Sequence, residues 1–265
     1  MSERPELDPA GLREEAERLA LASAWPGCPG GGWQFPFDLG DGIVARTYNP
    51  HQARVHPWRR DVLIANLAKR FAGAFDKLSV LDLGACEGAM AEGLWQRGVR
   101  DITLVEARAI NIEKGKFIAK TKGYDFRFIE APLEEHLAGE SRTYDVVLLL
   151  ATLQTLLNPF GVSRLIARCT RQIAVYDTAV AVVKNLSVGN TANSGTPSSA
   201  AFFLRYFSPD ATTAGLREVE LWPTRDALET LIKVSGFSRA WEADYGQHPD
   251  PWYSSGEWTM LFAEK

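Results

Sequence analysis

Short apolar segments alternate with helical stretches between residues 79 and 176, and this alternation is the strongest constraint on the fold. Five segments have the length of buried strands: Val80–Leu83, Ile102–Val105, Phe126–Ile129, Val146–Leu150 and Ile173–Tyr176. Helices are expected between them near Ala89–Arg97, Ile110–Lys122 and Phe160–Cys169. Repeated strand–helix–strand units form a parallel sheet covered by helices. The sequence therefore predicts an α/β protein.

The flanking segments complete this prediction. A helix near Arg225–Val234 and strands at Phe237–Ala243 and Glu257–Phe262 close the chain. Thr178–Gly215 is rich in Ser, Thr, Asn, Gly and Pro, and a loop of this length is expected to leave the sheet as an insertion. We therefore expect a core at residues 79–265 with an insertion around residues 178–215, preceded by an N-terminal lid segment at residues 1–78.

The N-terminal segment contains helix signals, helix-breaking residues and many aromatic side chains. A short helix should begin at Asp8-Pro9, because a capping side chain there precedes a proline at the first helical position. Pro26–Gly32 predicts a hinge or linker, and Pro57–Phe71 predicts a second helix. Aromatic side chains recur through the segment at Trp33, Phe35, Phe37, Tyr48 and Trp58. Together these features predict a lid that excludes water from a site in the core.

Composition excludes several other classes of protein. The 265 residues are 46% hydrophobic and 23% charged, which is typical of a globular chain. A net charge of -4 provides no general attraction for nucleic acid or anionic lipid. No apolar run is long enough to span a bilayer, and the N-terminus lacks the pattern of a secretory signal. The scattered cysteines and histidines show no disulfide or metal-ligand spacing, so we expect a cytoplasmic protein without a metal.

A tight turn follows the first strand of the core, in the run Val80-Leu81-Asp82-Leu83-Gly84-Ala85-Cys86-Glu87-Gly88. Because they lack a Cβ, Gly84 can bring the backbone close to a ligand and Gly88 can let the next helix pack closely. Glu106 ends the second strand, where a carboxylate can accept hydrogen bonds from both hydroxyls of a ribose. Open α/β sheets bind ligands at the carboxyl ends of their strands. The turn and Glu106 therefore predict a nucleoside-type ligand.

Two nucleoside ligands compete for this turn. A dinucleotide needs the pattern G-x-G-x-x-G to hold its pyrophosphate, but the turn offers only Gly84 and Gly88, and Glu87 would repel phosphate. S-adenosylmethionine (SAM) instead carries a cationic ammonium and a sulfonium, which the carboxylates of Asp82 and Glu87 attract. The turn therefore indicates SAM rather than NAD.

The chain from Ser79 to Lys265 resembles the class I SAM-dependent methyltransferases. Asp82–Gly88 resembles the first motif of that family, Glu106 its ribose-binding acid, and Tyr144–Leu150 its fourth-strand motif. The resemblance implies a Rossmann-like fold with a seven-stranded, mostly parallel sheet whose last strand runs antiparallel. It also implies that residues following the strands contact SAM: Ala85, Ala107, Ala131, Pro132, Leu133 and Leu150.

Leu153–Phe160 is similar to a Leu-Tyr-His-Leu-Leu-Asp-Pro stretch in a branch related to wobble-uridine tRNA carboxymethyltransferases and several small-molecule methyltransferases. Two departures from the family pattern bear on the chemistry. Pro132 stands where many members have an acid for the adenine amino group, so adenine recognition falls to the Leu133 backbone, to Glu134 or to packing. Gln154 and Thr155 replace the Tyr-His pair, and neither side chain takes up a proton near neutral pH.

An alcohol acceptor would therefore need another base. Asp177, beside Tyr176 at the end of the fifth strand, is the candidate that faces the expected site, and we group Gln154 with these two as catalytic candidates. His51 and His56 are further candidates from the N-terminal segment. Arg54 and Arg59 could hold the methionine carboxylate of SAM by bidentate pairs, although a solvated helix face would explain them equally.

The residues leave four functions open. The first is a SAM-dependent methyltransferase acting on a small metabolite. The same pocket could instead fold SAM on itself, giving azetidine-2-carboxylate and methylthioadenosine. Alkyl transfer to tRNA is disfavoured by the acidic composition, although several lysines share one predicted helix: Lys114, Lys116, Lys120 and Lys122. A non-enzymatic binding module is the fourth, and the oligomeric state is open in every case.

Overall fold

The structure is a computed structural model that describes residues 8–183, 200–206, 216, 218–247 and 249–265. Most of the predicted insertion, including the polar tract Asn190–Pro197, and His248 lie outside the described residues. Among the described residues, every helix is too short or too polar to cross a bilayer.

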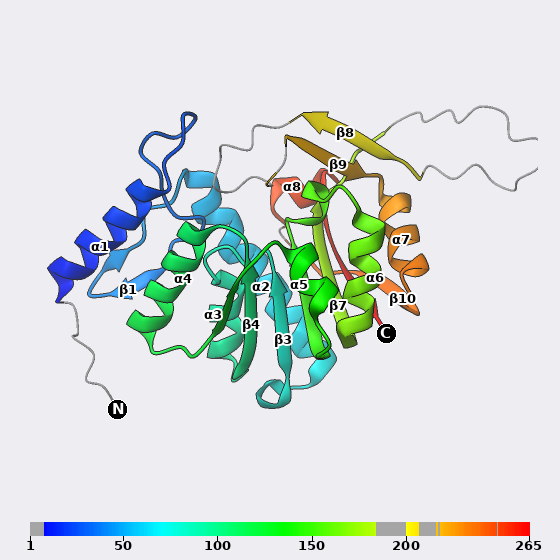
Figure 1. The fold of residues 1–265 in the computed structure, drawn as a ribbon, viewed down its shortest axis with the longest axis horizontal. Coiled ribbons are helices and arrows are strands. Elements are labelled where there is room, and N and C mark those ends of the chain that lie inside the picture. The colour runs from blue at the N-terminus through cyan, green and yellow to red at the C-terminus, as the bar shows by residue number, and fades with distance from the viewer. Residues whose placement is uncertain (1–7, 184–199, 207–215, 217, 248) are drawn as a thin grey trace, which may run out of the picture. The chain divides into compact units, whose positions relative to one another are not determined.

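Seven strands of the described chain pair into one sheet, in the order β10-β11-β7-β6-β3-β4-β5 (Figure 1). Their bounds are β3 (Ser79–Leu83), β4 (Asp101–Glu106), β5 (Arg127–Glu130), β6 (Tyr144–Leu150), β7 (Thr170–Ala179), β10 (Arg239–Glu242) and β11 (Trp258–Glu264). β4 runs parallel to β3 and β5, and β6 runs parallel to β7, whereas β11 is antiparallel to both β7 and β10. The predicted α/β fold, the mostly parallel sheet and its antiparallel last strand are confirmed.

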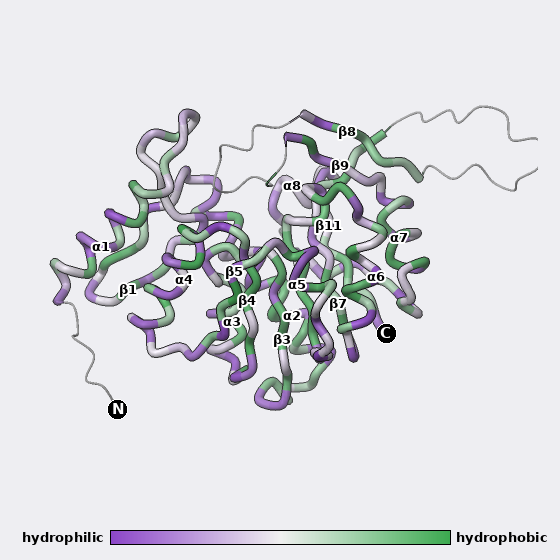
Figure 2. The backbone as a smooth tube through the Cα atoms, viewed as in Figure 1, coloured by the Kyte–Doolittle hydropathy of each residue, from purple (hydrophilic) through white to green (hydrophobic). Residues whose placement is uncertain are grey.

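The central strands are hydrophobic because both of their faces are covered. Every residue of β3 and β6 is buried, and the hydrophobic colour runs along β4 in Figure 2. Parallel strands that are buried on both faces have continuous apolar sequences. This is why apolar runs located these strands correctly in the sequence.

The chain separates into two compact units at residue 133. Besides β3, β4 and β5, the first unit holds α1 (Pro9–Ala22), β1 (Asp38–Gly40), β2 (Ile43–Val44), α2 (Pro50–Phe71), η1 (Phe75–Lys77), α3 (Ala89–Gln96) and α4 (Ala109–Lys122). Within this unit α1 lies beside α4, and α2 packs on α3 (Figure 1).

The second unit begins at Glu134, within α5 (Leu133–Gly139), and holds β6, β7, β10 and β11. It adds η2 (Leu153–Thr155), α6 (Pro159–Cys169), β8 (Phe202–Tyr206), β9 (Val219–Pro223), α7 (Arg225–Val234) and α8 (Pro251–Ser254). β8 and β9 pair as an antiparallel hairpin that was not predicted from the sequence. Their apolar patterns are short and lie in or next to a stretch that is mostly polar. The predicted helices at Phe160–Cys169 and Arg225–Val234 are confirmed within one residue.

The second helix begins earlier than predicted. Its N-cap is Asn49, whose side chain accepts a hydrogen bond from the backbone N–H of Gln52 at 3.0 Å, and Pro50 occupies the first turn. Pro57, predicted as the start, lies inside the helix. The prediction was wrong because two prolines, Pro50 and Pro57, lie near this helix start, and only Pro50 follows a side chain that can cap.

The glycine-rich stretch at Pro26–Gly32 is a packed turn in place of the predicted hinge. Gly31 N–H donates to the Cys28 carbonyl at 2.9 Å, and Gly32 N–H donates to the Ala20 carbonyl at 3.0 Å. Gly31 has φ +56°, and a Cβ at this position would overlap the Ala20 carbonyl oxygen. The glycines therefore permit a close approach between the turn and the end of α1.

The aromatic residues after this turn form a local core. Trp33 and Phe37 are fully buried and Phe35 nearly so, packed with Leu19 of α1 and Ile118 of α4. Trp33 Nε1 donates to the Ala16 carbonyl at 3.0 Å, so its polar atom is also satisfied. These rings pack the N-terminal segment onto α1 and α4; their role as a lid stays a prediction.

We predict that Gly31→Ala lowers the free energy of unfolding by about 2–3 kcal/mol, because the added methyl group overlaps the Ala20 carbonyl and the left-handed backbone disfavours a side chain. Urea denaturation measures this change. Gly30→Ala is the matched control: the nearest atom to its added Cβ is 3.9 Å away, on Arg46. Equal stability of the two variants would contradict the packing described for Gly31.

Candidate functional site

The turn between β3 and α3 contains left-handed residues and is hydrogen-bonded to the end of β4. Gly84, Cys86 and Gly88 have φ of 71°, 50° and 82°, in the left-handed region. The N–H groups of Gly84 and Ala85 donate to the Val105 carbonyl at 2.9 and 3.1 Å, which ties the turn to the end of β4. Two of the left-handed positions are glycines, as that conformation favours, and Cys86 adopts it at some cost in strain.

Glu106 fixes the same turn from the end of β4. Its Oε2 accepts from the Cys86 N–H and its Oε1 from the Arg108 N–H, both at 2.9 Å. Only 8% of the residue is exposed, and burial raises the pKa of its carboxyl although these donors oppose the shift. A carboxylate has about four lone-pair sites, so Glu106 can accept further hydrogen bonds. The structure thus brings Glu106 to the turn, as the sequence predicted.

Asp82 carries a buried carboxylate oxygen that has no hydrogen-bond partner among the described residues. This atom is Oδ2, and the residue is 2% exposed. Burial and the neighbouring Glu106 charge raise the pKa of Asp82 to about 7, while the Arg59 charge opposes them. A buried carboxylate oxygen without a partner is costly. A cationic hydrogen-bond donor at this position would relieve that cost.

Arg59 of α2 is the buried cation near Asp82. It is 5% exposed and its Nη1 donates to His56 Nδ1 at 3.1 Å. Since a guanidinium can only donate, the neutral His56 ring carries its proton on Nε2. Burial and the Arg59 charge lower the pKa of His56 to about 3. His56 in this tautomer presents an N–H at Nε2, and its role as a base stays a prediction.

Arg54 differs from Arg59 in its surroundings. It is an exposed residue of α2, and its Nη2 donates to His51 Nδ1 at 3.1 Å. The Arg59 charge acts on Asp82, whereas Arg54 is not among the groups that shift the pKa of Asp82. The two predicted arginines therefore differ in burial, and a role for either with the methionine carboxylate stays a prediction.

The remaining predicted contacts of the first unit follow β4 and β5. Ala107 comes directly after Glu106, and Ala131 N–H donates to the Glu106 carbonyl at 3.1 Å. Ala107, Ala131 and Pro132 are half-buried, and Leu133 is buried. These four residues therefore line the carboxyl ends of two adjacent strands with small or apolar groups.

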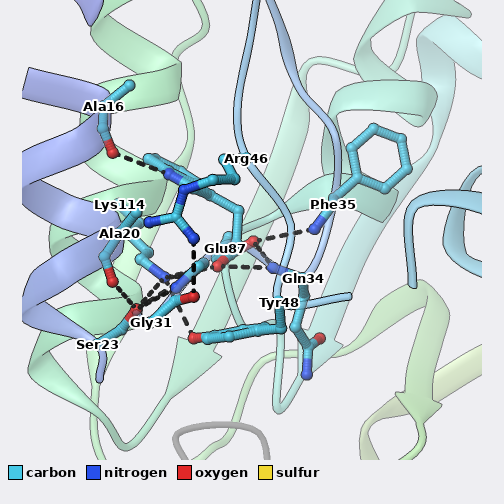
Figure 3. A network of polar contacts seen from close by, with 12 residues as sticks. Ala16, Ala20, Ser23, Gly31, Gln34, Phe35, Arg46, Tyr48, Glu87 and Lys114 are labelled. Atoms are coloured by element: carbon cyan, nitrogen blue, oxygen red, sulfur yellow. Dashed lines mark hydrogen bonds and ion pairs between the residues drawn. The ribbon is translucent and has the colours of Figure 1, made fainter. Parts of the chain in front are cut away.

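Glu87 uses its carboxylate inside the protein. Its oxygens accept from the Gln34 N–H at 2.9 Å and the Phe35 N–H at 3.4 Å, and Oε1 lies 3.0 Å from Lys114 Nζ (Figure 3). Burial alone would lower the pKa of Lys114, but the Glu87 carboxylate acts together with Tyr48 and Cys86 to raise it. The Glu87 carboxylate, predicted to attract a cationic ligand, therefore forms an ion pair with Lys114 of the same chain.

Sequence reasoning missed the buried position of Lys114, which it grouped with the lysines of a helix surface. Lys114 is 0% exposed. A signal was present: Lys114 stands four residues after Ile110 and four before Ile118, so it shares their face of α4. A lysine on an apolar helix face indicates a buried carboxylate partner elsewhere in the chain.

The catalytic candidates of the second unit have internal partners. Asp177 is 0% exposed, and its Oδ1 accepts from Trp258 Nε1 at 2.6 Å and from the Tyr253 hydroxyl at 2.9 Å. The Gln154 amide accepts from the Thr178 hydroxyl at 2.8 Å and donates to the Ala151 carbonyl at 3.0 Å.

Tyr176 precedes Asp177 in β7 and is fully buried; burial raises the pKa of its hydroxyl. Leu150, which ends β6, is also buried. Roles in catalysis for Asp177, Tyr176 and Gln154, and a SAM contact for Leu150, stay predictions.

Comparison with known proteins identifies the central part of the chain. Residues 80–174 match a family model described as a methyltransferase domain. The ubiquinone biosynthesis O-methyltransferase of Klebsiella pneumoniae (strain 342) is 29% identical over 118 residues, which cover 44% of this chain and 46% of that protein. The chain thus spans about half the length of the curated relatives it matches.

Solved structures share the fold over a longer stretch. The N-terminal domain of EvdMO1 with SAH bound has a TM-score of 0.67 at 19% identity, covering 99% of both chains. The magnesium protoporphyrin IX methyltransferase (ChlM) from Synechocystis PCC 6803 with bound SAH has a TM-score of 0.54 at 14% identity, covering 85% of this chain and 90% of that one. At these identities the likeness establishes the fold.

The raised pKa of Asp82 predicts how stability depends on pH. The Asp82 carboxyl ionises near pH 7 in the folded protein and near pH 4 in the unfolded chain. Between these pH values the unfolded chain releases the proton and the folded protein keeps it, so the free energy of unfolding falls as pH rises. Relative to the wild type, Asp82→Asn should gain about 2–3 kcal/mol in free energy of unfolding between pH 5 and pH 8. Urea denaturation at both pH values tests this, with the exposed Asp61→Asn as the control. A pH-independent difference would contradict the assignment.

Proposed function

Because residues 80–174 match a methyltransferase-domain model, we propose that the chain binds SAM at the turn after β3 and methylates a small molecule. The observation that carries this proposal is the unpartnered, buried Asp82 Oδ2 beside a turn that Glu106 holds open. A ligand with an ammonium group and a ribose supplies the donors that these two carboxylates can accept.

Each part of SAM has a counterpart in the first unit. Glu106 would accept hydrogen bonds from the ribose hydroxyls, and Asp82 would accept from the ammonium. Arg59 is a buried cation suited to the methionine carboxylate. The small residues at the ends of β4 and β5, Ala107 and Ala131, together with Leu133, would pack against adenine. The left-handed backbone at Gly84 lets the turn approach the ligand without a clashing Cβ.

Bound SAM supplies an electrophilic methyl group on its sulfonium. The contribution of the chain is to align the acceptor and to exclude water, which are effective means of catalysis for a substitution between two bound reactants. Gln154 and Thr155 cannot take up a proton, and the His56 ring presents N–H at Nε2. We therefore favour an acceptor that needs little help with deprotonation, such as an amine, thiol or carboxylate. A role for Asp177 in orienting an acceptor stays a prediction.

No contact among the described residues favours the two alternative reactions of SAM. The burial of Lys114 removes one member of the lysine cluster that supported alkyl transfer to tRNA, and the comparisons add no support for that branch. The matched family model describes a methyltransferase domain and the relatives that the chain resembles are methyltransferases, which favours transfer to an acceptor over self-cyclisation of SAM. We accordingly propose methyl transfer alone and leave cyclisation as an outcome of the activity test.

We predict that the protein binds SAH and that Glu106→Ala weakens binding at least tenfold, because the variant loses the ribose acceptor and frees the turn that Glu106 holds. Isothermal titration calorimetry measures both dissociation constants. Asp61→Asn, which changes a carboxylate that is 75% exposed on α2, should bind as the wild type does. An unchanged affinity in Glu106→Ala would place the nucleoside elsewhere.

We also predict that SAM is converted to SAH only when a small-molecule acceptor is present, and that Glu106→Ala abolishes this turnover. Liquid chromatography with mass detection, run over a panel of amines, thiols, carboxylic acids and phenols, identifies the acceptor class. Methylthioadenosine formed from SAM alone would overturn methyl transfer in favour of cyclisation.

A further inference from the structure

The buried ion pair between Glu87 and Lys114 has no part in the proposed contacts with SAM. Lys114 Nζ lies 3.0 Å from Glu87 Oε1 and 3.0 Å from the Ser23 hydroxyl, and it also donates to the Gly32 carbonyl (Figure 3). The Tyr48 hydroxyl is a more distant acceptor at 3.3 Å. Both charged side chains are buried, with exposures of 0% for Lys114 and 1% for Glu87.

Each member of the pair comes from a different element of the first unit. Glu87 belongs to the turn itself, between Cys86, whose N–H is bound by Glu106, and Gly88, the N-cap of α3. Its carboxylate binds the backbone at Gln34 and Phe35 of the N-terminal segment.

Lys114 reaches the same segment from α4. Besides Ser23, Gly32 and Tyr48, its ammonium lies 5.0 Å from the centre of the Trp33 ring, a distance at which a cation is attracted to an aromatic face. The turn, α4 and residues 23–48 therefore meet at one pair of charges.

Stability alone does not explain such a pair. Removing two charges from water costs several kcal/mol per ion, and apolar side chains of similar volume often stabilise a core as well or better. What a fully bonded ion pair does provide is direction: three N–H donors and two carboxylate oxygens fix the relative placement of the backbones that they bind.

We propose that Lys114 and Glu87 are positioning residues: their pair holds the turn at residues 84–88 in its ligand-binding shape by tying it to residues 23–48. This inference rests on the proposed function in that the turn is taken as the SAM site. It makes the segment at residues 23–48 a fixed support of that site, ordered before any ligand binds.

The test measures hydrogen exchange of the ligand-free full chain and its affinity for SAH. In Lys114→Met, the amides of residues 23–48 and of residues 84–88 should both exchange at least fivefold faster, and SAH should bind at least tenfold more weakly. The matched control is Glu113→Gln on the same helix, which breaks the exposed 2.6 Å pair with Arg18 of α1. This control should leave exchange in the turn and SAH affinity unchanged.

A second variant separates positioning from stability. Lys114→Met alone leaves the Glu87 charge buried without its cation, so it can lose stability or fail to fold. Glu87→Gln combined with Lys114→Met removes both charges and should regain the urea midpoint of the wild type. If the pair positions the turn, this double variant still exchanges rapidly at residues 84–88 and still binds SAH at least fivefold more weakly.

Two results would overturn the proposal. One is unchanged exchange at residues 84–88 in the double variant, which would limit the pair to holding the N-terminal segment. The other is recovery of wild-type SAH affinity along with stability. If the wild-type protein binds no SAH, the proposed function fails, while the ligand-free exchange measurement still decides whether the pair fixes the turn.

Discussion

The structure of the candidate site depends on one carboxylate that binds backbone N–H groups on two sides. Glu106 ends β4 and accepts hydrogen bonds from the Cys86 N–H in the turn after β3 and from the Arg108 N–H just after β4. These bonds hold the ends of β3 and β4 together. Parallel strands place their carboxyl ends at one edge of a sheet. A buried acid at that edge can shape the turn beside it and still retain lone pairs for a ligand.

Three acids surround this turn, and their environments separate their roles. Asp82 is buried with an oxygen that no described residue satisfies, Glu87 is neutralised by Lys114, and Glu106 is bound by backbone donors. Asp82 and Glu87 are close together in sequence, and Glu106 ends the neighbouring strand, but the three carboxylates have different partners. The one without an internal donor at Oδ2 is the one suited to a cationic ligand group.

Much of the fold and part of the site could be predicted from the sequence. The strands β3, β4 and β6 follow from apolar runs that only burial on both faces explains, and Glu106 follows from its place at the end of such a run. The helix at α2 was misplaced because a local proline signal occurs twice, and the hairpin of β8 and β9 was missed in a polar stretch. From the sequence, Glu87 was expected to attract a ligand and Lys114 to lie on a helix surface. Their contact joins residues 27 positions apart, and local sequence patterns do not reveal a contact at that separation.

The sequence by itself determined the order of strands and helices, the glycine turn and the acid that follows the next strand, because each of these depends on neighbouring residues and on a period of two or 3.6. Only the tertiary structure decided which charged side chains are available to a ligand. Whether a carboxylate is unpartnered, like Asp82, or neutralised, like Glu87, depends on which distant side chain packs against it, and burial makes that choice costly to reverse.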